Sequence, residues 1–364
     1  MSVYITNYEV ECNAGDLTSL MQALYNKESK ITIDTNYING NEPVGLGKMK
    51  DGNFFEILLS KVSNVLKASS LNDFKDTLLI VGSSVGGMRE SETIYFRDGN
   101  YKNIDPSKHA ISVISETLDQ EFSFADTRAI STACTSSANA LLLAKRLIEV
   151  DAYKNILVVG ADALCHTTVC GFHALGVLSD TPCRPFDKSR NGMNVAEAIA
   201  VLLLSSEKSD ESIEFLGAGA SSDAHHMTHP DPEGKGAIAA MSAALKDAEI
   251  EPSEIDYINA HGTGTVANDN VEALAISQMF NNCYVSSSKA ITGHTLGAAG
   301  ALEATIACET IRQGIIPPQT GLIEQENNSL NIPTDPIETK PCYVLSNSFA
   351  FGGNNASLLL GRVK

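Results

Sequence analysis

A single cysteine stands among small hydroxyl residues in STACTSSANALLLAKRL, residues 131–147, directly ahead of an Ala/Leu-rich helical pattern. A strand is expected to end near Thr132, which places Cys134 at a helix N-terminus. There the free N–H groups and the positive end of the helix dipole favour a thiolate nucleophile. The alternative is a buried structural thiol, which is a common fate of free cysteines.

A histidine, His261, follows an apolar strand pattern in INAHGTGTVANDNVEA, residues 258–273. The Gly-Thr-Gly-Thr turn after it would leave the imidazole exposed at the end of the sheet. Asp269 and Glu272 open the next expected helix, where carboxylates are favoured. A capped core histidine is the structural alternative.

A second histidine, His294, lies between glycines in SSSKAITGHTLGAAGALEA, residues 286–304. Lys289 precedes it by five residues, and Glu303 lies on the helix that follows. Close helix packing alone explains the glycines, but it does not explain a Lys and a His beside them.

A Gly-Gly turn follows two phenylalanines in SNSFAFGGNNASLLL, residues 346–360. Gly352 and Gly353 permit positive φ and a close approach of the backbone. Such a turn can aim N–H groups at a developing oxyanion. A tight hairpin turn is the structural alternative.

Three histidines, His225, His226 and His229, cluster in DAHHMTH. They could bind a metal, but no acidic or cysteine ligand stands at a suitable spacing. The preferred interpretation is a loop beside a pocket, and no metal site is predicted.

Strands that alternate with helices must position these residues. Such alternation indicates an α/β protein with mainly parallel, buried sheets. Strands are expected at 2–10, 77–84, 129–132, 155–162, 198–206, 213–220, 255–262, 283–289, 343–349 and 356–363. Helices are expected at 16–25, 53–68, 135–150, 234–248, 269–280 and 297–313.

Two segments, 129–150 and 285–311, share one plan of a strand, a small-residue turn and a long Ala/Leu-rich helix. This favours a chain of two pseudo-duplicated halves, 1–206 with Cys134 and 207–364 with both His261 and His294, whose turns meet in the middle. Any two strand–helix units share some likeness, which is the alternative.

Composition limits the function classes. The chain has 364 residues, 43% of them hydrophobic, and a formal net charge of −18, which argues against nucleic acid as a partner. Eight scattered cysteines without a CxxC pair indicate a reducing compartment. No signal peptide and no membrane-spanning run is recognised, so we expect a cytoplasmic protein without membrane contact.

Taken together, these motifs resemble the β-ketoacyl-[acyl carrier protein] synthases of the elongating, type II-like class. These are Cys-His-His condensing enzymes of the thiolase superfamily. The resemblance runs from about residue 78 to the C-terminus and includes TACTS, RPFDKSRNG, SSDAHHMTHPDPEGKGA, NAHGTGT, SSKAITGHTLGAAGALEA and NSFAFGGNNASLLL. It implies a thiolase fold, with two pseudo-duplicated halves in a five-layered αβαβα arrangement.

The resemblance also implies roles. Cys134 would carry the acyl group as a thioester, and His261 and His294 would promote decarboxylation of malonyl-acyl carrier protein. Lys289 would set the electrostatics of the histidines, paired with Glu303. The product would be 3-ketoacyl-acyl carrier protein, in fatty acid or in polyketide or polyene synthesis, with no cofactor required.

Other roles follow from the same resemblance. The backbone N–H groups of Cys134 and Phe351 would hold the oxyanion. Phe351, in the Gly-Gly turn, would gate the path between substrate pockets, with Phe172 as a second gating ring. Thr263 and Thr265 would lie along the pantetheine tunnel.

The sequence also departs from the family. The opening TGxG-type strand is replaced by ITNYEVECNAG, the region before LLIVGSSVGG is shorter by several tens of residues, and the arginine shortly after Phe172 is absent. Ala196 and Ala198 replace glycines around an acid, which we interpret as altered core packing without effect on the catalytic residues. Carrier recognition must therefore differ, and the candidate cations are Arg128, Lys145, Arg146 and Arg190.

The expected partners are acyl- and malonyl-loaded acyl carrier protein and either a second copy of the chain or a homologous chain-length partner. One alternative function is a carrier-binding chain-length or scaffold subunit without full condensing activity, which the intact Cys134 disfavours. Another is a thiolase or a chain-initiating synthase with a Cys-His-Asn set, and the histidine of TGHTLGAAG disfavours the initiating type.

Overall fold

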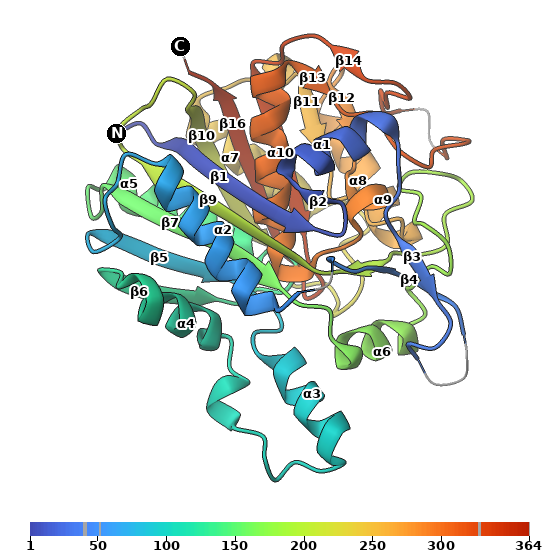
Figure 1. Ribbon diagram of the computed structural model, residues 1–364. Coiled ribbons are helices and arrows are strands. Elements are labelled where there is room, and N and C mark those ends of the chain that lie inside the picture. The colour runs from blue at the N-terminus through green and yellow to red at the C-terminus, as the bar shows by residue number, and fades with distance from the viewer. Residues whose placement is uncertain (39–41, 51, 327–328, 364) are drawn as a thin grey trace.

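The computed structural model describes residues 1–38, 42–50, 52–326 and 329–363. Its core is one continuous hydrogen-bonded sheet of eleven strands, which consists of two five-stranded sheets joined at β1 and β10, with the short β2 paired to β1 (Figure 1). The first sheet has the order β1-β9-β7-β5-β6, with β7, β5 and β6 parallel and β1 and β9 antiparallel to their neighbours. Its strands are β1 (Tyr4–Cys12), β5 (Thr77–Gly82), β6 (Asp126–Ile130), β7 (Asn155–Asp162) and β9 (Ala198–Ser205).

The second sheet repeats this topology. Its order is β10-β16-β15-β11-β12, again with three parallel strands and two antiparallel neighbours. Numbered within each half, both sheets have the order 1-5-4-2-3, so the expected pseudo-duplication is confirmed. The strands are β10 (Ile213–Ser222), β11 (Tyr257–Asn259), β12 (Tyr284–Ser286), β15 (Tyr343–Phe349) and β16 (Asn354–Arg362).

The two sheets are joined by a short antiparallel contact between β1 and β10, at Tyr4 with Glu214 and Ile5 with Ile213. The expected division of the chain after residue 206 lies between β9 and β10, and that boundary stays a prediction.

Two long helices lie between the sheets and form the middle layer. Helices α5 (Ser136–Glu149) and α10 (Ala299–Gln313) pack against each other and against strands of both sheets. They approach closely because a Cβ at Gly300 would come within 2.6 Å of the backbone N of Ala138. Nearly all of α10 is buried, which agrees with its Ala-rich sequence.

Outer helices cover both sheets and complete the five layers. Helices α2 (Phe54–Ala68) and α4 (Ser112–Phe122) pack on the first sheet, and α7 (Lys235–Ala248) packs on the second with α8 (Val266–Met279) beside it. The expected αβαβα arrangement is therefore confirmed.

The remaining elements are short or peripheral. Helix α3 projects from the body of the molecule (Figure 1). No helix in the described ranges is long and apolar enough to cross a membrane. These elements are α1 (Leu17–Asn26), α3 (Met88–Asp98), α6 (His166–Ala174), α9 (Lys289–Thr292), β2 (Gly15–Asp16), β3 (Thr32–Asp34), β4 (Val44–Gly47), β8 (Val195–Ala196), β13 (Ile315–Ile316), β14 (Ile337–Glu338) and the 3-10 turns η1 (Pro106–Lys108), η2 (Pro252–Glu254) and η3 (Leu296–Ala298).

Candidate active site

Cys134 lies in a tight turn between β6 and α5. Ala133 immediately before it has a φ of 53°, a left-handed conformation that is costly for a residue with a Cβ. The Ala133 carbonyl accepts hydrogen bonds from the hydroxyls of Ser84 and Ser136, at 2.9 and 2.6 Å, and these hold the turn. The helix begins at Ser136, two residues later than the cysteine.

Burial controls the ionisation of this thiol. Cys134 is only 7% exposed, and its burial raises its pKa to about 11. The charge of Lys289 and the backbone N–H groups of Phe351 and Cys134 itself oppose this rise but do not cancel it. The expectation that the helix terminus favours a thiolate is therefore wrong for the resting thiol, because Cys134 precedes the helix and loses its hydration.

His294 faces the sulfur. Its Nε2 lies 3.1 Å from Cys134 Sγ, and its Nδ1 accepts the backbone N–H of Leu296 at 3.2 Å. Burial, followed by the charge of Lys289, holds the pKa of His294 well below its ordinary value, so the ring is neutral. Because Nδ1 is an acceptor, Nε2 carries the proton and donates toward the sulfur.

His261 has the same tautomer for a different reason. Its Nδ1 lies 3.3 Å from Nζ of Lys289, and an ammonium group can only donate. Burial and then the charge of Lys289 keep the pKa of His261 well below its ordinary value. The two histidine rings lie 5.2 Å apart at 85°, and both line the cavity into which the thiol opens.

Lys289 forms a buried ion pair with Glu303, and both side chains are almost inaccessible. Burial raises the pKa of Glu303 to about 7, and the charge of Lys289 opposes this rise. The pair keeps a cation directly behind the two imidazoles, since Glu303 anchors the ammonium from helix α10.

The two acids of α8 hold the backbone of the turn after His261. Glu272 accepts the N–H groups of His261 and Gly262, each at 2.8 Å, and Asp269 accepts those of Phe186 and Gly264 at 2.9 and 3.2 Å. Burial raises the pKa of both carboxyls, that of Glu272 to about 7. They position the histidine turn through its main chain.

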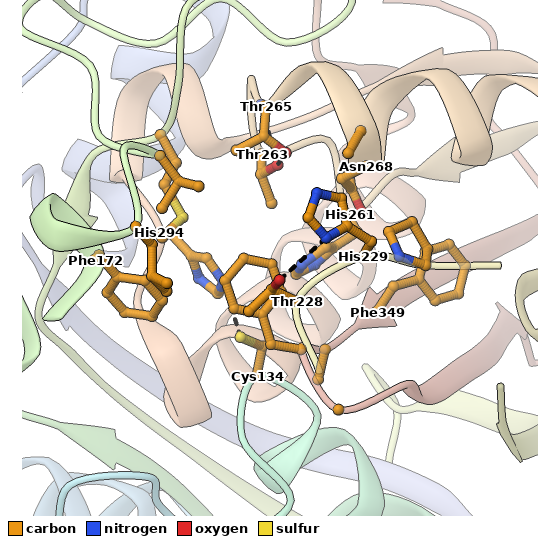
Figure 2. Close-up of a pocket in the computed structure, with 18 of the residues that line it drawn as sticks. Cys134, Phe172, Thr228, His229, His261, Thr263, Thr265, Asn268, His294 and Phe349 are labelled. Atoms are coloured by element: carbon orange, nitrogen blue, oxygen red, sulfur yellow. Dashed lines mark hydrogen bonds between the residues drawn. The ribbon is translucent and has the colours of Figure 1, made fainter. Parts of the chain in front are cut away.

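Cys134, His261 and His294 open into one cavity of about 240 Å³ (Figure 2). Thr263 and Thr265 line it, with their hydroxyls 2.9 Å apart. The full lining is Cys134, Phe172, Leu175, Val177, Met193, Asp223, Thr228, His229, Pro230, His261, Thr263, Thr265, Ala267, Asn268, His294, Phe349, Ala350, Phe351, Gly352 and Asn355.

The Gly-Gly turn connects β15 to β16, so the hairpin interpretation is right, and the turn also reaches the cavity. Gly352 and Gly353 have φ values of 87° and 79°, which favour glycine. The rings of Phe351 and Phe172 lie 5.9 Å apart across the cavity. The structure therefore brings together all the residues that the resemblance assigned to the site.

The comparisons with known proteins now decide the family. Residues 50–210 match the family model described as "Beta-ketoacyl synthase, N-terminal domain", and residues 213–322 match "Beta-ketoacyl synthase, C-terminal domain". The chain belongs to the β-ketoacyl synthase family. Its expected membership is confirmed over most of its length.

Curated β-ketoacyl synthases agree. The 3-oxoacyl-[acyl-carrier-protein] synthase 2 of Coxiella burnetii is 41% identical over 257 residues, which are 64% of this chain and 61% of that enzyme. The enzyme of the same name from Staphylococcus aureus is 32% identical over 306 residues, 77% of this chain and 75% of that one. The aligned part of the chain thus spans less than two thirds of the Coxiella enzyme.

Solved β-ketoacyl synthase structures confirm the thiolase fold. The ketosynthase ApeO in complex with its chain length factor ApeC, from Xenorhabdus doucetiae, matches with a TM-score of 0.92 and 32% identity, covering all of this chain and 98% of that one. The ishigamide ketosynthase/chain length factor matches with a TM-score of 0.90 and 25% identity, covering 100% and 99%.

The alanines that replace family glycines lie beside the site. The backbone of Ala196 donates to the carbonyl of His294 at 2.9 Å, so this segment supports a histidine of the site directly. Cβ atoms at Gly47 or Gly293 would come within 2.5 and 2.7 Å of the Cβ of Ala196. Those glycines make room for the alanine, which is a packing effect, and the absence of an effect on the catalytic residues stays a prediction.

Among the candidate carrier-binding cations, Lys145 and Arg190 are unsuitable. Lys145 is 2% exposed and pairs with Glu149 and Asp247. Arg190 is 6% exposed and pairs with Asp269 and Glu326. Of the other two, Arg146 shares the acids of Lys145, and Arg128 pairs with Asp126 at the edge of the sheet.

The histidine loop 223–231 borders the cavity through Thr228 and His229 (Figure 2). His226 and His229 contact each other through their Nδ1 atoms at 3.3 Å, and the hydroxyl of Thr228 contacts both. Within the described residues, no group of three or more His, Cys, Asp or Glu side chains is arranged to hold a metal.

Sequence reasoning missed Asp162, the last residue of β7. Its carboxylate accepts the hydroxyl of Ser83 and the backbone N–H groups of Ser84, Val85 and Gly297. Burial raises its pKa to about 6. Asp162 thereby joins the turn after β5 to the turn after His294. A lone acid that ends an apolar strand was the available signal.

Proposed function

We propose that this chain catalyses a decarboxylative Claisen condensation of an acyl thioester with malonyl-acyl carrier protein, giving 3-ketoacyl-acyl carrier protein. The observation that carries the proposal is the buried thiol of Cys134 in contact with His294, with the neutral imidazole of His261 beside His294 in the same cavity. Fatty acid synthesis and polyketide or polyene synthesis both use this reaction.

In the first step, Sγ of Cys134 attacks the carbonyl carbon of the incoming acyl thioester. The bond from that carbon to the carrier's sulfur breaks, and the proton from the Cys134 thiol leaves on the released carrier thiol. The backbone N–H groups of Cys134 and Phe351, which both lie against Sγ, stabilise the tetrahedral oxyanion. The acyl group is then held as a thioester on Cys134.

In the second step, malonyl-acyl carrier protein loses CO2. The bond between its carboxylate carbon and α-carbon breaks, and the electron pair remains as an enolate. The Nε2–H groups of His261 and His294 donate to the enolate oxygen. Neutral imidazoles suit this role, because they stabilise the developing charge without a full proton transfer.

In the third step, the enolate carbon forms a bond to the acyl carbon on Cys134. The bond between that carbon and Sγ breaks, and the thiolate takes up a proton from solvent. Lys289, anchored by Glu303, keeps His261 in the donor tautomer throughout, and the backbone N–H of Leu296 does the same for His294. Glu272 and Asp269 are positioning residues for the histidine turn.

The cavity supports roles for the remaining residues. Phe351 and Phe172 stand where paired rings would gate the path between the malonyl and acyl groups. Thr263 and Thr265 line the route that the pantetheine arm would follow. Gly352 and Gly353 give the Phe351 turn its positive φ values.

The proposed partners are acyl- and malonyl-loaded acyl carrier protein and either a second copy of this chain or a homologous chain-length partner. The ketosynthase similar to this chain, ApeO, was solved with its chain length factor, which supports the second arrangement. All eight cysteines are free, which supports a cytoplasmic location.

The test is acyl trapping. Wild-type protein is incubated with acyl carriers of several chain lengths, and intact mass is measured. We expect an acyl adduct that disappears in Cys134→Ala, together with all condensation. Full condensation by Cys134→Ala refutes the proposal, and an unreactive Cys134 favours the scaffold subunit.

A further inference from the structure

Helix α6 carries the ring of Phe172 but has few attachments of its own to the core. Val169 is its single buried residue, and the side chain of its N-cap residue, Cys165, makes no capping hydrogen bond. Near its other end, His173 contacts Glu42 at 2.7 Å, through side chains that are 39% and 63% exposed. Such an exposed pair contributes little, so the helix depends on contacts made to it from elsewhere.

Glu92 of α3 supplies the missing cap. One carboxylate oxygen accepts the backbone N–H of His166 at 2.7 Å, and the other accepts that of Thr167 at 2.6 Å. These are the first two residues of α6, so a negative charge stands at the positive end of the helix. A carboxylate from a distant part of the chain thus takes the role that the N-cap side chain usually fills.

The contacts between the two helices follow one face of α3. Met88, Glu92 and Phe96 are spaced by four residues, which places them on the same side of the helix. The sulfur of Met88 accepts the hydroxyl of Thr168 at 3.9 Å. The ring of Phe96 lies edge-on to that of His166, with 5.3 Å between centroids. This face of α3 therefore packs against α6, with Glu92 at its centre.

The other end of α6 reaches the reacting groups. Phe172 lies in the last turn of this nine-residue helix and lines the cavity that holds Cys134. Its ring faces that of Phe351 across 5.9 Å (Figure 2). Main-chain hydrogen bonds tie the turns of a helix together, so a displacement of the first turn is passed on to the last. The cap made by Glu92 therefore bears on where the ring of Phe172 stands.

We propose that Glu92 is a positioning residue for the condensation, which acts through α6 to hold the ring of Phe172 against that of Phe351. The paired rings keep water from the acyl group on Cys134 until the enolate attacks. Without the cap, water attacks the acyl carbon and the bond from that carbon to Sγ breaks. The products are the free carboxylic acid and the Cys134 thiol, which takes up the second proton of the water. This inference rests on the proposed function, since it requires an acyl group on Cys134.

The experiment measures how the acyl group on Cys134 divides between condensation and hydrolysis. Protein acylated with the hexanoyl thioester of N-acetylcysteamine is mixed with malonyl-acyl carrier protein, and the 3-keto product and free hexanoic acid are quantified. Glu92→Ala removes both acceptors, and Glu92→Gln keeps one. Glu90→Ala is the matched control, because Glu90 lies on the same helix and, in the part of the chain that the structure describes, makes no hydrogen bond or ion pair with α6.

We expect Glu92→Ala to lower the ratio of condensation to hydrolysis about tenfold, and Glu92→Gln to give an intermediate ratio. Glu90→Ala keeps the wild-type ratio. Phe172→Ala lowers the ratio at least as far as Glu92→Ala. Adding Glu92→Ala to Phe172→Ala changes the ratio no further, because a residue that acts through the ring has no effect once the ring is removed. A merely structural role would slow both reactions together and leave the ratio unchanged.

Hydrogen exchange of residues 166–174 gives a second measurement that needs no activity. Their amides should exchange faster in Glu92→Ala than in wild type or in Glu90→Ala. Three results overturn the positioning role: unchanged exchange in α6, an unchanged ratio, or a full effect of Glu92→Ala in the Phe172→Ala background. If wild-type Cys134 takes up no acyl group, the proposed function fails. If wild type condenses and Glu92→Ala does so with the same ratio, only the positioning role fails.

Discussion

Lys289→Met tests the claim that a buried cation fixes His261 as a donor. In the wild type, Nζ of Lys289 lies 3.3 Å from Nδ1 of His261 and pairs with Glu303. Methionine fills a similar volume but donates nothing. Nδ1 of His261 then takes the proton in a share of molecules, and Nε2 becomes an acceptor that repels an enolate.

The magnitude follows from the contact that is lost. A hydrogen bond to a charged group contributes about 1.5–3 kcal/mol, which corresponds to about 10- to 150-fold in the decarboxylation rate. The stability loss is smaller than the about 3–5 kcal/mol typical of a broken buried pair. Burial already raises the pKa of Glu303 to about 7, so the carboxyl left behind takes up a proton at little cost.

The assay measures CO2 release from malonyl-acyl carrier protein in a Cys134→Gln background, where acyl transfer is blocked and decarboxylation is expected to continue. Lys289→Met/Glu303→Gln is the control, since it leaves no unpaired buried carboxyl and still lacks the donor to His261. Both Lys289 variants should lose the same activity, while urea unfolding shows the double variant to be the more stable. If Lys289→Met in the Cys134→Gln background decarboxylates within twofold of Cys134→Gln alone at neutral pH, the tautomer reasoning is refuted.

Three further predictions concern stability, each measured by urea unfolding. The folded state binds the proton of Glu303 more tightly than the unfolded state, because burial raises this pKa from 4.5 to about 7. The free energy of unfolding of wild type should therefore fall by about 3 kcal/mol relative to Glu303→Gln as pH rises from about 5 to about 8. A change in the opposite direction contradicts the assignment. Asp162→Asn should cost about 3 kcal/mol, because an amide cannot accept from all of its buried donors; a loss below about 1 kcal/mol would show that the site relaxes. Ala133→Gly should add about 1 kcal/mol to the free energy of unfolding by relieving the positive φ, and no gain would contradict the strain assigned to this turn.

Much of the framework was predictable because it is periodic. Each of the ten expected strands corresponds to one of the ten core strands, since buried strands are continuous apolar runs bounded by turn residues. Helices α3 and α6 were not predicted, because they lack a periodic apolar pattern of this kind. Each buries a single side chain, Ser91 in α3 and Val169 in α6, so neither shows an apolar face in its sequence.

The protonation states and supporting contacts of the site were less predictable than the identity of its residues. The residues could be found from motifs, but the pKa of Cys134 depends on its burial in the fold and on Lys289 and Phe351, which are distant in the sequence. The role of Asp162 depends on loops far away in the sequence that only the fold brings to it. Likewise, no local pattern indicates that Gly47 and Gly293 make room for Ala196.

The repeated strand order has a consequence for how the site could be disturbed. Cys134 follows the third strand of the first repeat, and His294 follows the third strand of the second, each just ahead of a central helix. The reacting thiol and its imidazole are thus contributed by opposite halves. A rigid-body rotation of one half against the other would change the 3.1 Å between Sγ and Nε2 before it disturbed either half internally. The proposed activity should therefore depend on the alignment of the two repeats, because each repeat contributes one of the two groups.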